Sequence, residues 1–158
     1  MKHLGLDEEL YSATCEKLQQ LGYPILDAAT RKAIEPYLKI ANYYTLGTHL
    51  NTKEMPVRVC IASVITIMSF IDDLFADDPG PICDFNYRLV HGTPQEHPAL
   101  TVFSRLLDEL PKFWDPVMAD MMRSSAMSFI TSIMIEYRMK NAKVNFSSLN
   151  LRAEFDVE

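Results

Sequence analysis

The chain has 158 residues, a length typical of one domain and sufficient to bury a hydrophobic core. Hydrophobic residues make up 48% and charged residues 23%, as in soluble globular proteins. The net charge of −6 comes without a basic patch, so nucleic acid is not an expected partner. The three cysteines, Cys15, Cys60 and Cys83, have no metal-binding spacing and cannot all pair. This favours a reducing, cytoplasmic location.

The spacing of apolar residues along the first third of the chain is helical, which predicts an all-α fold. A first helix is expected over residues 7–21. Asp27 is expected to cap a second segment, because its side chain can accept a hydrogen bond from the first helical turn. Pro36 is expected to break that segment or to start the next one, which continues over residues 37–50.

A long central helix is expected over residues 53–77, with Thr52 as its N-cap. It is apolar on nearly every face, which is typical of a helix surrounded by others. The apolar stretch from 59 to 71 is 13 residues long, fewer than the roughly 20 that a membrane span needs. The sequence therefore predicts a buried helix and no membrane span.

Helical spacing also predicts a short helix over residues 82–90, another over 98–113 and a long final helix that begins at Pro116. No repeat or linker interrupts these segments. We expect residues 1–140 to form one helical domain and residues 141–158 to form a divergent, poorly ordered tail.

Four carboxylates stand within seven residues at the end of the central helix, at Asp72, Asp73, Asp77 and Asp78. A helix carries partial negative charge at its C-terminus, so acids there are unfavourable unless a cation lies nearby. Asp73 and Asp77 are four residues apart and would share a face of a continuous helix. Hard oxygen ligands suit Mg²⁺. The cluster predicts a magnesium site at the mouth of an apolar interior, and a solvated acidic helix end is the alternative.

Other residue types suggest binding of a phosphate-bearing, apolar ligand. The guanidinium of Arg123 suits bidentate recognition of phosphate oxygens, although a lone arginine at this position is also typical of a surface. Phe70, Phe75 and Phe129 are expected to line a cavity and to stabilise a cation through their ring faces. Plain core packing is the alternative for these three rings.

Two segments resemble the class I terpene cyclases, specifically the fungal trichodiene synthase-like branch. The resemblance runs from about Tyr37 to Lys140, most of the chain. Its segments are Ile71-Asp72-Asp73-Leu74-Phe75-Ala76-Asp77-Asp78, and Met122-Arg123-Ser124-Ser125 followed by Phe129 and Ile135-Glu136-Tyr137.

This resemblance implies a helical terpenoid synthase fold that converts farnesyl diphosphate with Mg²⁺ into a sesquiterpene of the trichodiene type, in fungal secondary metabolism. Asp72 would be the main metal ligand, supported by Asp73. Ala76 stands where the family commonly has its third acid, and Asp77 follows one residue later. Arg123 would match the arginine that senses the diphosphate.

The second metal motif of such cyclases, Asn-Asp-x-x-Ser-x-x-x-Glu, does not occur in the chain. The chain therefore resembles the N-terminal portion of a cyclase, and the activity of this portion alone is in question. The alternative is a non-catalytic helical remnant or interaction module that associates through uncovered apolar surface, as in a homodimer. A chain-elongating prenyl transferase is disfavoured, because Pro79-Gly80-Pro81 follows the acids where paired arginines would be expected.

Overall fold

The computed structural model describes residues 5–48 and 54–142, and in these ranges the chain forms helices, turns and loops without strands. The predicted all-α fold is confirmed. The elements, in chain order, are α1 (Glu8–Gln20), α2 (Ala28–Thr48), α3 (Met55–Leu74), the 3₁₀ turn η1 (Gly80–Ile82), α4 (Phe85–His91), α5 (Pro98–Glu109), the 3₁₀ turn η2 (Leu110–Lys112) and α6 (Pro116–Asn141). Residues 143–158, for which a poorly ordered tail was expected, lie outside the described ranges.

Pro36 lies inside α2, so the predicted break at this residue is wrong. Proline cannot donate a backbone hydrogen bond and its ring crowds the preceding turn, which destabilises an isolated helix. The buried side chains of Ile34, Leu38 and Ala41 flank Pro36 at helical spacing and pack into the core. Burial on both sides of the proline therefore stabilises one continuous helix, and tertiary packing overrides the local preference.

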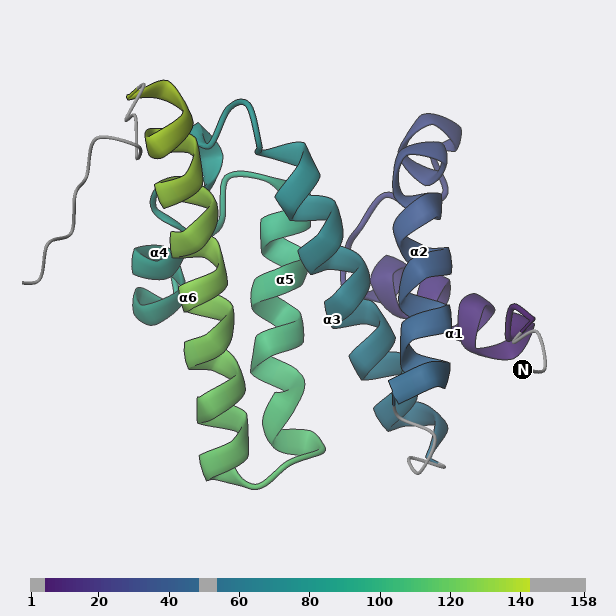
Figure 1. Cartoon of the computed structure of the whole chain (residues 1–158). Helices are drawn as coiled ribbons and strands as arrows, with labels where there is room; N and C mark the ends of the chain where they lie inside the picture. The colour runs from purple at the N-terminus through teal and green to yellow at the C-terminus, as the bar shows by residue number, and fades with distance from the viewer. Residues whose placement is uncertain (1–4, 49–53, 143–158) are drawn as a thin grey trace, which may run out of the picture.

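Helix α3 lies between the α1–α2 pair and the α5–α6 pair (Figure 1). It is shorter than the expected 53–77: its N-cap is Glu54, and it ends at Leu74. Phe75 follows with non-helical dihedral angles, and its ring is buried edge-on against His97, with centroids 5.3 Å apart. The helix therefore ends just before a residue whose side chain belongs to the core. The expected N-cap, Thr52, lies outside the described ranges.

By length and composition alone, α3 could cross a membrane, since it has 20 residues with a mean hydropathy of 1.6. Its packing in the described part of the chain is that of a core helix, against α1, α2 and α5. The side chains that it buries are Cys60, Ala62, Ser63, Thr66, Ile67, Phe70 and Ile71.

The N-terminal end of α3 is tied to α1 and α2 by a polar network around Asp7. Arg58 of α3 donates a hydrogen bond to Oδ2 of Asp7, 2.7 Å away, and Leu10 donates its backbone N–H to Oδ1, 3.0 Å away. The amide side chain of Asn42, only 1% exposed, exchanges two hydrogen bonds with the backbone of Asp7. The hydrogen bond from Leu10, and then the guanidinium of Arg58, lower the pKa of Asp7.

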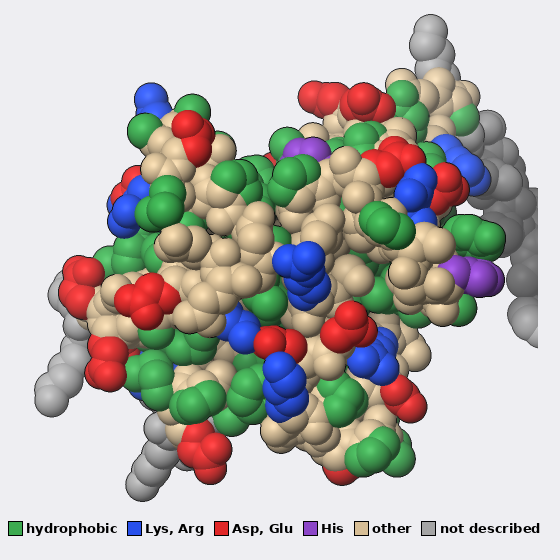
Figure 2. Space-filling model, turned by 180° about the vertical axis from the view of Figure 1, so that it is seen from behind, with side chains coloured by type: hydrophobic (Ala, Val, Ile, Leu, Met, Phe, Trp, Pro, Cys, Tyr) green, Lys and Arg blue, Asp and Glu red, His purple; other side chains and the backbone are tan. Residues whose placement is uncertain are grey.

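Helix α6 leaves much of its surface uncovered. Of its 26 residues, four are buried: Ala119, Ala126, Ile130 and Ile133. Val117 and Met121 are apolar but 68% and 59% exposed. On the opposite side of the molecule, acidic and basic side chains are interspersed over the visible face (Figure 2).

Candidate metal and diphosphate site

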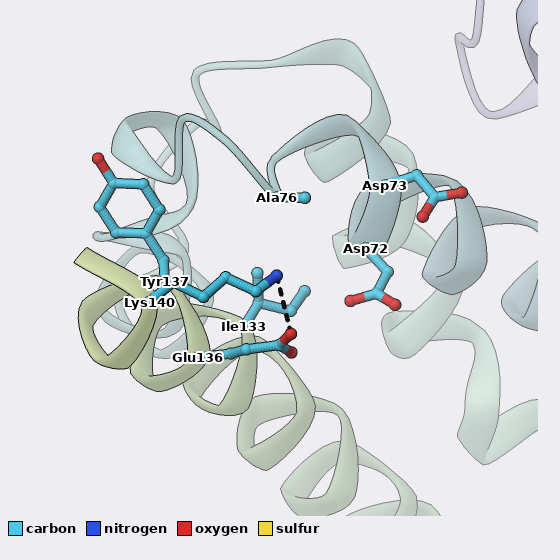
Figure 3. A pocket seen from close by; sticks show the side chains of 7 residues that line it. All are labelled: Asp72, Asp73, Ala76, Ile133, Glu136, Tyr137 and Lys140. Atoms are coloured by element: carbon cyan, nitrogen blue, oxygen red, sulfur yellow. Dashed lines mark ion pairs between the residues drawn. The ribbon is translucent and has the colours of Figure 1, made fainter. Parts of the chain in front are cut away.

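The C-terminal end of α3 and the last turns of α6 enclose an open cleft of about 130 Å³ (Figure 3). The side chain of Asp72 points toward α6, whereas that of Asp73 points away from it (Figure 3). The two neighbouring carboxylates therefore face different helices. The cleft is lined by Asp72, Asp73, Ala76, Ile133, Glu136, Tyr137 and Lys140.

Asp73 is held by α2. The hydroxyl of Tyr37 donates a hydrogen bond to Oδ2 of Asp73 over 2.6 Å, and the Tyr37 ring packs edge-on against Phe70. This hydrogen bond, together with partial burial, raises the pKa of Tyr37 to about 12. The Tyr37 hydroxyl thus stays protonated near neutral pH and fixes the direction in which Asp73 points.

Asp72 faces two charged side chains of α6. Partial burial raises the pKa of Asp72, and the negative charges of Asp73 and Glu136 raise it further, while the ammonium of Lys140 opposes them. Lys140 Nζ lies 2.9 Å from Oε1 of Glu136, one turn earlier on α6. This ion pair raises the pKa of Lys140, with smaller contributions from Asp77 and Asp72. One lysine therefore partly neutralises the acids of the cleft.

Asp77 and Asp78 lie beyond the helix. Because α3 ends at Leu74, the expectation that Asp73 and Asp77 share a helical face is wrong. Asp77 does not line the cleft, and its negative charge contributes to the raised pKa of Lys140. Asp78 serves the following turn, where its Oδ1 accepts the backbone N–H of Gly80 at 3.1 Å.

Arg123 lies in the first half of α6 and is bound to α5. Its Nε donates to the carbonyl oxygen of Leu107 at 3.1 Å, and its guanidinium lies 3.5 Å from Oδ1 of Asp108. It precedes Glu136 by 13 residues, which corresponds to about 20 Å along a helix axis. The structure does not bring Arg123 to Asp72 or Asp73 of the cleft.

The three aromatic rings expected to line a cavity lie in or against the hydrophobic core. Phe70 packs edge-on against Tyr23 and Tyr37, and Phe75 against His97. Phe129 is partly buried against the core cluster. The cleft at Asp72 is lined by none of these three rings.

In the described ranges, no group of three or more His, Cys, Asp or Glu side chains is placed to hold a metal ion. Mg²⁺ in proteins commonly keeps several waters and uses one or two carboxylates together with substrate phosphates. Asp72 and Glu136 supply carboxylate oxygens of this type from opposite sides of the cleft. These oxygens fit Mg²⁺ when phosphate oxygens complete the ligand set. The cleft also contains a cationic group of the protein itself, the ammonium of Lys140.

Sequence reasoning missed Glu136 and Lys140. Glu136 belongs to a segment that carries the family resemblance, but no site role was predicted for it or for Lys140, and both stand more than sixty residues from Asp72. Their spacing of four on an expected helix, one turn after the apolar Ile133, was the available signal. Only the packing of α6 beside the end of α3 shows that this face meets the aspartates.

Comparison with known proteins agrees with terpene synthase-like character. Over 139 residues, the chain is 23% identical to alpha-cuprenene synthase COP6 of Coprinopsis cinerea. The match covers 88% of this chain and 42% of that protein, so the chain spans less than half the length of the curated relative. No family model matches the chain, and no solved structure matches it. This likeness supports the terpene synthase class without selecting a branch within it.

Proposed function

We propose that the chain carries the diphosphate-binding part of a terpene synthase, which binds farnesyl diphosphate with Mg²⁺ in the Asp72 cleft for ionisation and cyclisation to a trichodiene-type sesquiterpene. The observation that carries this proposal is the position of Asp72. It faces Glu136 and Lys140 across a cleft at the end of an apolar helix. The similarity to alpha-cuprenene synthase over most of the chain supports it. A cytoplasmic location is part of the same proposal.

In this proposal, Asp72 is the principal metal ligand. When bound, Mg²⁺ would neutralise charge on the diphosphate leaving group. Asp73 would support Asp72 after giving up its hydrogen bond from Tyr37, and Asp77 would act from the loop beyond α3. A diphosphate contact by Arg123 has no support in the described geometry, because that guanidinium is bound to α5.

The cleft is large enough for a head group but not for a whole prenyl diphosphate. Its volume of about 130 Å³ is below the roughly 300 Å³ at which ligand pockets usually begin. A separate apolar groove of about 340 Å³ lies between α3, α5 and α6. Its lining is mostly apolar, as a hydrocarbon tail requires. The residues lining it are Val64, Met68, Leu107, Leu110, Met118, Met121, Met122, Ser125 and Ala126.

The experiment that tests the proposal is incubation of the purified chain with farnesyl diphosphate and Mg²⁺. Released pyrophosphate and extracted terpenes would be measured for the wild type and for Asp72→Asn. We expect Mg²⁺-dependent pyrophosphate release that falls roughly tenfold or more in Asp72→Asn, since a ligand to the metal is lost. The proposal would be refuted if the wild type showed no turnover of farnesyl diphosphate and no Mg²⁺-dependent binding of it.

A non-catalytic interaction module is the second candidate, and the uncovered face of α6 favours it. Val117, Met118 and Met121 are exposed there beside the apolar groove. This candidate predicts a concentration-dependent dimer in sedimentation experiments that Met121→Glu disrupts, and no stabilisation by Mg²⁺ with pyrophosphate. A monomer at all concentrations would contradict it.

A further inference from the structure

Lys140 lies where the proposed function would put a metal ion. Its ammonium is 2.9 Å from the carboxylate of Glu136, and it lines the same cleft as Asp72. In Figure 3 the lysine side chain runs back along α6, so that its ammonium lies over the cleft and not beyond the helix end. Three carboxylates, those of Glu136, Asp77 and Asp72, act on this one cation.

The position of Lys140 is not explained by helix electrostatics alone. A cation in the last turn of a helix is favourable beside the partial negative charge of the C-terminus. Arg138 in the same turn of α6 meets that requirement without lining the cleft. The distinguishing feature of Lys140 is its position opposite Asp72, a carboxylate on a different helix.

We propose that Lys140 is a built-in counterion for the carboxylates of Asp72 and Glu136, and that a divalent cation must displace its ammonium in order to enter the cleft. Glu136 then becomes a second carboxylate ligand beside Asp72. The inference rests on the proposed function for the identity of the cation as Mg²⁺. It concerns the protein and the cation alone, without substrate.

Two consequences follow for metal binding. Lys140 competes with the metal, so the wild-type cleft binds a divalent cation weakly until phosphate oxygens add ligands. Removing the ammonium leaves Asp72 and Glu136 with uncompensated negative charge, which a divalent cation relieves. The gain in affinity is about fivefold, the size of effect expected for a solvent-exposed charge pair.

The test uses Mn²⁺ as the probe, because it prefers the same oxygen ligands as Mg²⁺ and its free form is counted by its electron paramagnetic resonance signal. The wild-type chain of 158 residues is compared with Lys140→Met, Lys140→Arg and Glu136→Gln. We expect about fivefold tighter Mn²⁺ binding by Lys140→Met, wild-type affinity for Lys140→Arg, and weaker binding by Glu136→Gln. Circular dichroism confirms that each variant is folded.

The matched control is Lys39→Met. Lys39 forms the same kind of ion pair with Glu35, four residues earlier on α2 at 2.7 Å, and it does not line the cleft. Lys39→Met lowers the net charge by the same amount, and we expect no change in Mn²⁺ affinity. An equal gain in Mn²⁺ affinity in Lys39→Met and Lys140→Met would show that only the net charge of the chain matters, and it would overturn the proposal.

Unchanged or weaker Mn²⁺ binding in Lys140→Met would also overturn the proposal, and so would the absence of binding in every variant. The outcome is independent of catalysis. Tighter binding in Lys140→Met without any binding or turnover of farnesyl diphosphate would support the counterion and refute the proposed function. Turnover of farnesyl diphosphate by the wild type, together with the same Mn²⁺ affinity in wild type and Lys140→Met, would support the proposed function and refute the counterion.

Discussion

Each end of α3 has a carboxylate beside a cation, but the pKa of the carboxylate is lowered at one end and raised at the other. At the N-terminal end, Asp7 accepts hydrogen bonds from Leu10 and Arg58, and its pKa is lowered. At the C-terminal end, burial and the neighbouring acids Asp73 and Glu136 raise the pKa of Asp72. The first carboxylate stabilises the packing of α1 on α3. The second is held in an unfavourable field that Lys140 partly relieves, as expected of a binding site rather than of a structural contact.

The largest expected difference in the free energy of unfolding is between substitutions at two adjacent residues at the C-terminal end of α3. Ile71 is fully buried, whereas Asp72 faces the cleft. Ile71→Ala should lower the free energy of unfolding by about 2–5 kcal/mol, because it leaves a cavity in the core. Asp72→Asn should change it by less than about 0.5 kcal/mol. Urea titration measures both variants, and a comparable loss in Asp72→Asn would mean that this residue is structural.

At the N-terminal end, Asp7→Ala should lower the free energy of unfolding by about 1–2 kcal/mol, because α1 loses its cap and Arg58 loses its partner. Asp27→Ala is the matched control, since Asp27 caps the next helix through Thr30 and is exposed. A smaller loss is expected there. Equal midpoints in thermal unfolding for the two variants would show that Arg58 adds nothing to the cap.

The two ends should also differ in how stability depends on pH. The lowered pKa of Asp7 means that its contribution is present above the unfolded pKa of about 3.9 and is lost as pH falls through the folded value. The raised pKa of Asp72 has the opposite sign: the folded chain takes up this proton first, so stability rises as pH falls through that value.

Unfolding measured from pH 3 to 7 in Asp7→Asn and Asp72→Asn separates these two contributions. We expect Asp7→Asn to weaken the loss of stability on acidification. Asp72→Asn should remove the opposing contribution and steepen that loss. The same pH dependence in both variants would mean that the two carboxylates do not differ in environment.

The smallest expected effect is a change in the pKa of Tyr37, which tests its hydrogen bond to Asp73. The hydrogen bond from Tyr37 raises the pKa of Tyr37 to about 12, and Asp73→Asn should return it toward about 10. Ultraviolet absorbance titration follows this change, and Tyr37→Phe identifies the transition. Tyr23, whose pKa burial raises to about 12, is the internal reference and should not move. An unaltered titration in Asp73→Asn would contradict the hydrogen bond between α2 and α3.

Local sequence signals predicted the fold well where a single residue decides the local structure. Asp27 caps α2 as expected, and Pro116 begins α6. The signals failed where packing decides. Pro36 stays inside a continuous α2, where buried residues lie on both sides of it, and α3 ends at Leu74, before Asp77, where the buried Phe75 follows.

The candidate site was only partly predictable for the same reason. The carboxylates are visible in the sequence because four of them are close together. Glu136 and Lys140 were not, since their relation to Asp72 depends on how α6 packs beside the end of α3. The position of Arg123 likewise follows from its hydrogen bond to the α5 backbone, which no local pattern indicates.

The most direct test of the central claim is the shift in thermal unfolding midpoint caused by pyrophosphate, measured with and without Mg²⁺ in the wild type and in Asp72→Asn. A ligand that binds only the folded chain raises the midpoint. We predict a rise in the wild type that requires both pyrophosphate and Mg²⁺ and that is lost in Asp72→Asn. An equal rise in Asp72→Asn, or no rise in the wild type at saturating concentrations, would contradict the assignment of this cleft to a metal-bound diphosphate.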